Sequence, residues 1–590
     1  MVEESCNKQI PSQSSLSTQA VDDNKSIRSN SVEQKPNDED NNSRSKKSNV
    51  FWTFIGLQIA LFLAALDGTI VATALPTIGS DFNSMSIVSW VATAYILTFD
   101  SFQPLFSKFS DIFGRKWILM FGIVVFLIGS LLCAVSTSII MLIVFRAIAG
   151  IGAAAVFSMV FVVVADLVPL EKRASYQGII NAVFGVSSVC GPLIGGSFTD
   201  YVTWRWNFYI NLPIGAVAMV MIFFFLHLPI PKEGFIAKLK RIDFVGTFIV
   251  LAFSTLFLLA MNFGGQTFPW KSAAVIVPLV LTVILVAILY YVETKVAEPL
   301  MPPRLFKNRS VVAVLLTNWL LGMTFFSMLY YLPVYFQVVR GDSATWSGIR
   351  LIPMQLFLSV IATVVGFFIS KSGIYKPLPP IGMALLTICV GLLSILDLDS
   401  SFSSKLTSCT INKLSDSSKT IEVYGFTIIG GFALGFVIPA AIIALQASVE
   451  PKDIAVVTGL GNFSRILGGA LGVAISSAIL NTSLAQDLAL YVPADIVSKI
   501  LDSSNYVRNG CPPEYLEIVL KCYVDAIRLI WHVMIGMSGF GFCLSCLIKA
   551  HPIRKPKEQK EQKEQNTSTA PESVMIDIES KTEKQDENRQ

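Results

Sequence analysis

Fourteen apolar runs, most of them about twenty residues long, follow one another between Phe51 and Ile548. A helix needs about 20 mainly apolar residues to cross the hydrocarbon core of a bilayer. Because lipid offers the backbone no hydrogen-bond partners, each run has to satisfy its own N–H and C=O groups, as a helix does. The sequence therefore predicts an all-α integral membrane protein. The runs lie at residues 51–75, 87–106, 117–136, 139–164, 178–198, 206–228, 244–263, 273–292, 311–334, 347–369, 378–396, 422–446, 456–480 and 527–548.

The composition excludes several other classes of protein. Only 15% of the 590 residues are charged, whereas soluble domains carry about 25%. The formal charge of +4 is small and gives no reason to expect nucleic acid as a partner. The three histidines do not cluster, the nine cysteines lack metal-site spacing, and no nucleotide-binding or hydrolase motif is present. We expect no enzyme activity, no metal and no cofactor.

The two ends of the chain are polar. Residues 1–48 and 551–590 are rich in Ser, Asn, Gln, Lys and Glu and bury too little apolar surface to fold, which predicts disordered tails. Lys and Arg concentrate in the loops that an even number of spans would place on the same side as both tails. Such loops are cytoplasmic in most membrane proteins. Both termini are therefore predicted to be cytoplasmic.

Away from the ends of the apolar runs, four charged residues stand inside them, namely Asp67, Asp100, Arg146 and Arg465. A charge at the centre of a span costs roughly 2.5–3.5 kcal/mol on insertion scales, so it is a functional candidate by default. In one interpretation these charges only pair within the bundle. In the other, Arg146 tunes a carboxylate and either Asp67 or Asp100 carries a proton. Asp100 could also serve this protein's own substrate or face water on the cytoplasmic side.

The loop between the second and third runs holds Asp111, Gly114, Arg115 and Lys116. Its opposite charges lie at the predicted cytoplasmic edge of the membrane. They could anchor the loop by the positive-inside preference. Alternatively, they form a clasp between helices that closes the inner gate and breaks when the gate opens.

The fifth run carries a group of small residues and one proline, at Gly185, Gly191, Pro192, Gly195 and Gly196. Small residues let neighbouring helices approach closely, and proline removes one helical hydrogen bond and allows a bend. The stretch is interpreted either as ordinary helix packing or as a hinge-like interface that fixes the direction of exchange.

The longest predicted outer loop, residues 481–526, contains a glycosylation sequon at Asn481 and two cysteines, Cys511 and Cys522. A lumenal or extracellular loop permits both a glycan and a disulfide. The two cysteines could close a bridge in this polar segment or remain free thiols. Asn481 could lie too close to the bilayer to be modified.

These segments together resemble the major facilitator superfamily, in its fourteen-helix drug:proton antiporter branch of the fungal multidrug or vacuolar basic amino acid type. The loop at 107–116 is similar to G-x-L-x-D-x-x-G-R-[KR], although Ser107 and Phe109 replace the usual Gly and Leu. Other similarities are to L-D-x-T-I-V-x-x-A-L-P at 66–76, R-x-x-x-G-x-G at 146–152, the antiporter motif at 185–196, and W-R-W-x-F-x-I-N-x-P-x-G at 204–215. The family motifs include Asp67 and Arg146 but not Asp100. For the charged loop with Asp111 and Arg115, the resemblance favours a clasp between helices over simple anchoring.

The resemblance implies two six-helix bundles, at 49–228 and 311–550, with two additional helices within 229–310, making fourteen transmembrane helices. It implies proton-coupled antiport of small organic compounds by alternating access, as in drug efflux. Vacuolar import of basic amino acids is an alternative, and a non-transporting sensor on the same fold is a rival of another class. The expected partners are an organic substrate, protons and lipid. We expect a monomer in the plasma membrane or the vacuolar membrane.

Overall fold

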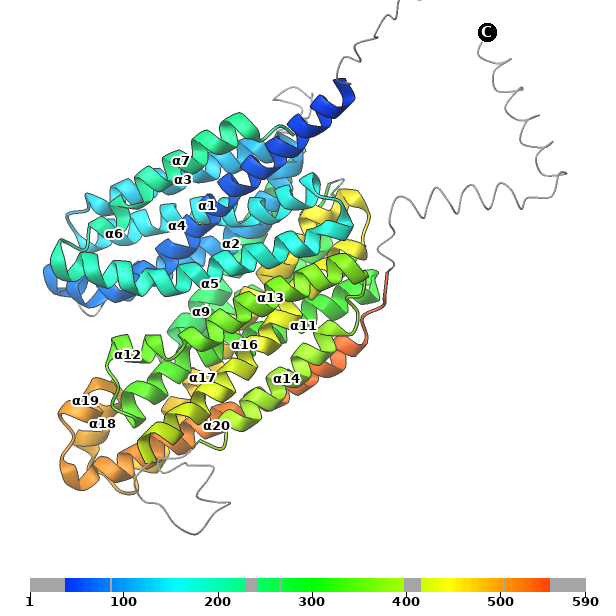
Figure 1. The fold of residues 1–590 in the computed structure, drawn as a ribbon. Helices are drawn as coiled ribbons and strands as arrows, with labels where there is room; N and C mark the ends of the chain where they lie inside the picture. The colour runs from blue at the N-terminus through cyan, green and yellow to red at the C-terminus, as the bar shows by residue number, and fades with distance from the viewer. Residues whose placement is uncertain are drawn as a thin grey trace, which may run out of the picture. The chain divides into compact units, whose positions relative to one another are not determined.

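The computed structural model describes residues 38–84, 87–228, 241–264, 268–296, 298–396, 415–502 and 504–551, and these residues form helices without a strand (Figure 1). The chain divides into two units, residues 1–48 and 49–590, and every candidate membrane span lies in the second. Residues 1–37 and 552–590, most of the two predicted tails, lie outside the described residues. The first helix nevertheless begins at Asp38, inside the predicted tail.

The helices follow the apolar runs, with ends that extend into polar sequence. Their bounds are α1 Asp38–Asp81, α2 Trp90–Phe113, α3 Arg115–Ala134, α4 Ile139–Leu167, α5 Leu170–Tyr201, α6 Trp206–Tyr209, α7 Asn211–Phe225, α9 Phe244–Phe263, α10 Ala273–Glu293, η1 Leu305–Lys307, α11 Arg309–Val334, η2 Tyr335–Val339, α12 Ala344–Ile349, α13 Ile352–Ser372, α14 Leu378–Leu393, α16 Ser415–Ala447, η3 Pro451–Asp453, α17 Ile454–Leu488, α18 Ala494–Asp502, α19 Ser504–Asn509 and α20 Pro513–Cys546.

Twelve helical segments in the described part of the chain are long and apolar enough to cross a membrane. Two further helices coincide with predicted runs. Helix α2 spans 24 residues but carries Asp100 and several other polar residues, and α14 is apolar but only 16 residues long. The predicted total of fourteen requires both to cross the bilayer, and it stays a prediction.

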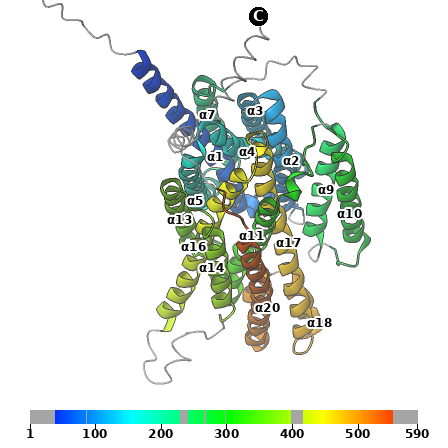
Figure 2. The same ribbon diagram turned by 90° about the vertical axis from the view of Figure 1, so that its right-hand side faces the viewer.

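The helices gather into two groups with a pair beside them. Helices α1 to α7 lie together and α11 to α20 lie together, while α9 and α10 pack on each other at one side, against α2 and α17 (Figures 1 and 2). Contacts run on from one group to the other, and residues 49–590 form one compact unit. The predicted boundaries of the two bundles therefore stay a prediction.

The two helix groups meet along a seam made mainly by α5 and α13. The Thr363 hydroxyl donates to the Gly178 carbonyl at 3.0 Å, and the Ser370 hydroxyl accepts from the Ser175 backbone N–H at 3.1 Å. These bonds join the first half of α5 to the second half of α13. Helices α2 and α17 also meet, and the Ser107 side chain lies against Gly459.

The segment predicted as a long outer loop, 481–526, is largely helical. Helix α17 continues past the predicted end of its run to Leu488, α18 and α19 follow, and α20 already begins at Pro513. Hydropathy marks where a helix leaves the membrane, whereas backbone hydrogen bonding continues in polar sequence. Proline is favoured at the first position of a helix, which explains the early start of α20.

Glycines allow α3 and α4 to pack in contact. A Cβ placed on Gly152 would lie 2.3 Å from the backbone nitrogen of Phe126. We expect Gly152→Val to force the two helices apart and to lower the free energy of unfolding by about 1–3 kcal/mol, as overpacking does. Thermal unfolding of the purified protein measures the change. Gly391→Ala is the matched control, since nothing lies within 4 Å of that position. An equal melting temperature for the two variants would contradict this packing.

Candidate substrate and proton site

A buried ion pair joins α1 to α4. The Arg146 guanidinium donates to the Asp67 carboxylate at 2.6 Å, and both side chains are almost completely inaccessible. The other carboxylate oxygen of Asp67 accepts from the Asn211 amide at 3.0 Å, and that amide also donates to the Ser130 hydroxyl at 3.1 Å. Buried charges persist only when they are paired and hydrogen-bonded. One carboxylate therefore holds α1, α4 and α7 in register.

Aromatic rings surround the guanidinium of this pair. Arg146 lies 4.1 Å from the ring centre of Tyr95 and 5.8 Å from that of Phe208, and its Nε donates to the Val91 carbonyl at 3.2 Å. Cation–π contacts of this kind are worth about 2 kcal/mol when desolvated. The sequence predicted the charges of Asp67 and Arg146 but not these neighbours. Asn211 belongs to the W-R-W motif, which was the available signal.

Asp100 has entirely different surroundings. It is buried in α2, and neither carboxylate oxygen has a hydrogen-bond partner among the described residues. One helical turn further on, the Gln103 side-chain amide is also buried without a partner. Asp100 lies within electrostatic range of Tyr330, which α11 contributes from the other helix group. Asp100 is thus buried without a neutralising partner among the described residues.

Arg465 is the corresponding charge in the second helix group, and it is only half-buried. No salt bridge joins it to a carboxylate within the described residues, and its guanidinium donates to the Asn462 side chain at 3.4 Å. Asn462 lies one turn earlier on α17. A neighbouring amide, rather than an acid, therefore solvates this cation.

The charged loop between α2 and α3 forms a cluster within the first helix group. Arg115 pairs with Asp111, and its Nε donates to the Asp166 carboxylate at the end of α4 at 2.8 Å. Gly114 has φ +98°, in the region that favours glycine. Lys116 donates to the Phe223 carbonyl of α7 at 2.6 Å. The predicted clasp therefore links α2, α3 and α4; its role in gating stays a prediction.

The glycines of α5 face different neighbours. A Cβ on Gly191 or Gly195 would collide with α1, at Thr69 and Ile70. Gly185 faces α13, where the Ser359 side chain fills the space, and Gly196 has nothing within 4 Å. The side chain of Pro192 lies outside the described ones, so the expected bend is not assessed there. Three of the glycines thus allow close helix packing, on two faces of α5.

Cys511 and Cys522, for which the sequence leaves open a bridge or two free thiols, are both free thiols in this structure. Cys522 is buried well inside α20, whereas Cys511 precedes that helix. At 1.5 Å per residue the intervening helix separates them by about 13 Å, and a disulfide needs α-carbons within about 7 Å. Asn481 lies inside α17 and its amide donates to Ser477, one turn earlier, at 3.5 Å. Glycosylation there stays a prediction.

No group of three or more metal-ligating side chains occurs in the part of the chain that the structure describes. The region thus holds one buried ion pair, Asp67 with Arg146, and the separate buried carboxylate of Asp100.

Comparisons with known proteins identify the family. A family model described as the Major Facilitator Superfamily matches residues 57–473. The chain belongs to the Major Facilitator Superfamily. It is therefore a transmembrane transporter, as the motifs predicted. Among its relatives, the MFS-type efflux pump MFS1 of Arthroderma benhamiae is 35% identical over 492 residues, covering 82% of this chain and 88% of the relative.

Further relatives and a solved structure support the same family. The efflux pump dotC of Dothistroma septosporum is 34% identical over 504 residues, covering 84% of this chain and 83% of the relative. The crystal structure of the human organic anion transporter MFSD10 matches with a TM-score of 0.53 at 16% identity, covering 84% of this chain and 99% of that one. At that identity the likeness supports the major facilitator fold alone.

The Asp67–Arg146 pair yields a stability prediction. We expect Arg146→Ala to destabilise this transporter by about 3–5 kcal/mol, because it leaves the buried Asp67 charge without its partner. Replacing both residues, with Asp67→Asn and Arg146→Ala together, should cost less than the sum of the single changes. Denaturation of the four proteins in one detergent measures the coupling. Additive losses would show that the two side chains do not interact.

Proposed function

We propose that this transporter is a proton-coupled antiporter that expels small organic compounds by alternating access. The observation that carries the proposal is the contrast between its two buried carboxylates. Arg146 neutralises Asp67 at 2.6 Å, whereas Asp100 has no partner among the described residues. An ionised group without a counter-charge is costly to bury. We therefore assign the transported proton to Asp100, and assign to Asp67 and Arg146 the task of holding the helices around it.

The direction and the substrate class of the proposal draw support from the relatives. Those named above are called efflux pumps. The gradient-driven mechanism follows from the sequence, in which no ATP-binding motif is present. Small organic compounds, drugs among them, are the proposed cargo. The names of these relatives favour efflux over vacuolar import of basic amino acids and over a sensor. We propose a monomer in the plasma membrane.

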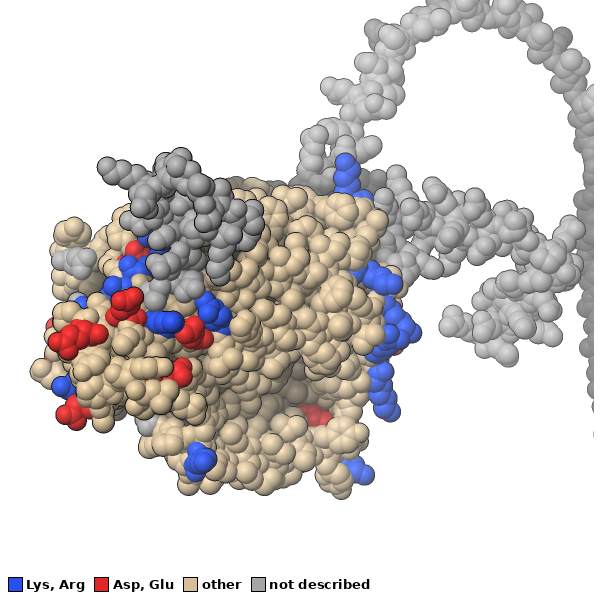
Figure 3. Space-filling model, turned by 90° about the horizontal axis from the view of Figure 1, so that it is seen from below, with Lys and Arg blue, Asp and Glu red and all other residues tan. Residues whose placement is uncertain are grey.

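The proposed orientation places both termini in the cytoplasm. Figure 3 shows mainly Lys and Arg along the right margin of one face, mixed charges at the left, and an almost uncharged expanse between them. Such an expanse suits contact with lipid, and a basic end suits the cytoplasmic side. The seam bonds join the first half of α5, whose first turn contains Lys172 and Arg173, to the second half of α13, whose last turn contains Lys371. We propose that this seam is the closed inner gate.

Proton coupling by Asp100 is tested with Asp100→Asn. The amide keeps the size of the side chain but binds no transferable proton. We expect transport of an organic substrate driven by a proton gradient to fall by at least about tenfold in proteoliposomes, while substrate exchange without a gradient persists. Ser101→Ala is the neighbouring control, since its hydroxyl is hydrogen-bonded at 3.2 Å to Thr255 of α9, away from Asp100. Undiminished gradient-driven transport would refute the assignment.

The same proteoliposomes distinguish a transporter from a sensor on this fold. A sensor would bind the organic compound without moving it across the membrane, whatever the gradient. Movement of substrate in the wild-type protein, lost on collapsing the gradient with a protonophore, would support antiport. Binding without movement would favour the sensor.

Asp111→Asn tests whether the charged loop holds the inner gate. It removes the partner that helps to fix Arg115 beside Asp166. We expect the cytoplasmic ends of the helices to loosen, so that a cysteine introduced at Gly459, beneath Ser107, becomes more reactive from the cytoplasmic side. Labelling with a membrane-impermeant maleimide measures this. Equal labelling rates with and without the Asp111 change would argue for simple anchoring.

A further inference from the structure

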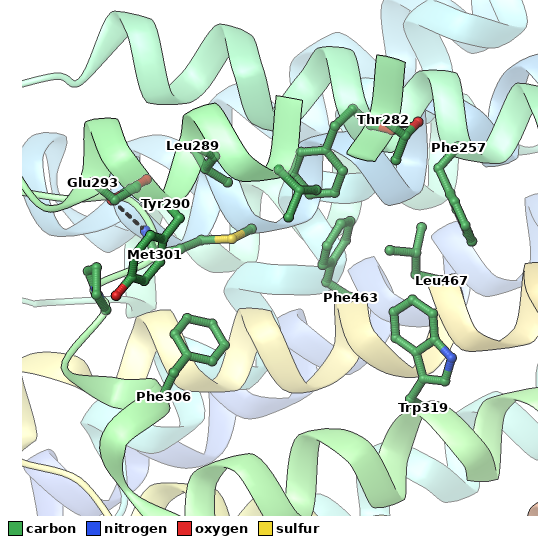
Figure 4. Close-up of a pocket in the computed structure, with 13 residues that line it drawn as sticks. Phe257, Thr282, Leu289, Tyr290, Glu293, Met301, Phe306, Trp319, Phe463 and Leu467 are labelled. Carbon is green, nitrogen blue, oxygen red and sulfur yellow. Dashed lines mark hydrogen bonds between the residues drawn. The ribbon is translucent and has the colours of Figure 1, made fainter. Parts of the chain in front are cut away.

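A cavity lies between the α9–α10 pair and helices α11 and α17, away from Asp67 and Asp100. It has a volume of about 500 Å³, within the range of about 300–1,000 Å³ typical of small-molecule sites. Figure 4 shows its walls, with side chains from α9 and α10 on one side and from α11 and α17 on the other. Six of its lining residues are aromatic: Phe253, Phe257, Tyr290, Phe306, Trp319 and Phe463.

The cavity has a buried floor and an exposed rim. Phe253, Phe463 and Leu289 are buried, whereas Tyr290 and Phe306 are exposed on the outside of the helices. Helix α10 lies at the edge of the structure in Figure 2, and most of its apolar surface is uncovered by protein. In a membrane that surface faces lipid. The cavity therefore opens sideways toward the bilayer.

One charged residue, Glu293, lines this cavity among the described residues. It ends α10 and lies at one end of the cavity in Figure 4. The side chain is only 3% exposed; Oε2 accepts from the Met301 backbone N–H at 3.2 Å, and Oε1 has no partner among the described residues. A buried carboxylate oxygen left unsatisfied costs free energy that a cationic ligand would recover.

The nearby basic residues are already engaged elsewhere. Lys108 and Arg241 both pair with Glu298, at 3.5 Å and 2.7 Å. Partial burial acts to raise the pKa of Glu298, but the hydrogen bonds and charges of Arg241 and Lys108 outweigh it and hold that pKa below its usual value. Near Glu293 lies also Asp243, whose Oδ2 has no partner among the described residues. Lys108 and Arg241 thus both pair with Glu298, and no salt bridge among the described residues joins a basic side chain to Glu293.

We propose that this cavity binds a lipophilic organic cation that enters from the inner leaflet of the membrane. The aromatic walls take the apolar body of the ligand, and the Glu293 carboxylate takes its positive charge. Aromatic faces also attract cations directly. On the orientation proposed above, Glu293 lies at the cytoplasmic end of α10, so the cavity is a loading site for substrates dissolved in the membrane. The role of the cavity as a loading site rests on the proposed efflux function.

The test measures binding, so it does not depend on transport. The purified full-length protein is placed in nanodiscs of uncharged glycolipid with a benzophenone-bearing quaternary ammonium probe and irradiated. Crosslinked peptides are then quantified by mass spectrometry. We expect label on the peptides that hold Phe253, Phe306 and Trp319. Tetraphenylphosphonium should compete for these positions, whereas tetraphenylborate, an anion of the same shape, should not.

Two variants separate charge from space. Glu293→Gln keeps an oxygen for the Met301 N–H but removes the negative charge, and we expect labelling to need about tenfold more probe. Leu289→Trp fills the cavity without changing its charge, and it should abolish the label. Glu517→Gln, an exposed acid on α20, is the matched control and should behave as wild type. Size-exclusion profiles and melting temperatures check that each variant is folded.

Three outcomes would overturn the proposal: undiminished labelling in Glu293→Gln, equal competition by tetraphenylborate, or loss of label when phosphatidylethanolamine is added to the nanodiscs. The last would assign the cavity to a lipid headgroup. The Asp100→Asn protein should keep the label in full. If wild-type protein is labelled as expected but moves no substrate, the proposed function fails and the binding site stands.

Discussion

The buried pair of Asp67 and Arg146 is the interaction on which the first helix group depends. Its two charges belong to α1 and α4, and the same carboxylate reaches α7 through Asn211. Lipid supplies no hydrophobic force between helices, so polar contacts and close packing determine which faces meet. An ion pair has a fixed geometry, so it specifies the relative orientation of the packed helices more precisely than apolar side chains do. The unpartnered Asp100 therefore sits in a framework that is fixed independently of it.

Much of this arrangement could be predicted because membranes restrict the possibilities. The apolar runs can be recognised directly in the sequence. The charges of Asp67 and Arg146 and the turn at Gly114 stand out because they interrupt or separate those runs. The motifs identified the family, which the comparisons confirmed. The residues that solvate the charges were harder to predict. Nothing in the spacing of Ser130 or Tyr95 shows that they face the same pair as Asn211, because that depends on how helices rotate against one another.

The errors have physical causes as well. The cysteines of residues 481–526 were considered as partners because that segment was treated as an open loop, whereas an early start to α20 carries Cys522 away from Cys511. The burial of Glu293 could not be predicted, because this residue directly follows the apolar run 273–292, where a solvated loop is expected to begin. Its burial comes from Met301 and the aromatic residues of other helices, and a single run contains no information about them.

The hydrogen bonds of the seam between α5 and α13 affect how fast the two helix groups can separate. Two of the seam's polar bonds, from Thr363 to Gly178 and from Ser359 to Asn181, run from hydroxyl groups to backbone carbonyls, across helices that glycines bring into contact. Each such bond between membrane helices contributes only about 0.6 kcal/mol. A hydroxyl can also turn back to a carbonyl of its own helix, as Thr363 already does to Ser359. The seam can therefore open one bond at a time, without a large barrier at any step, and domain motions of this kind take microseconds to milliseconds.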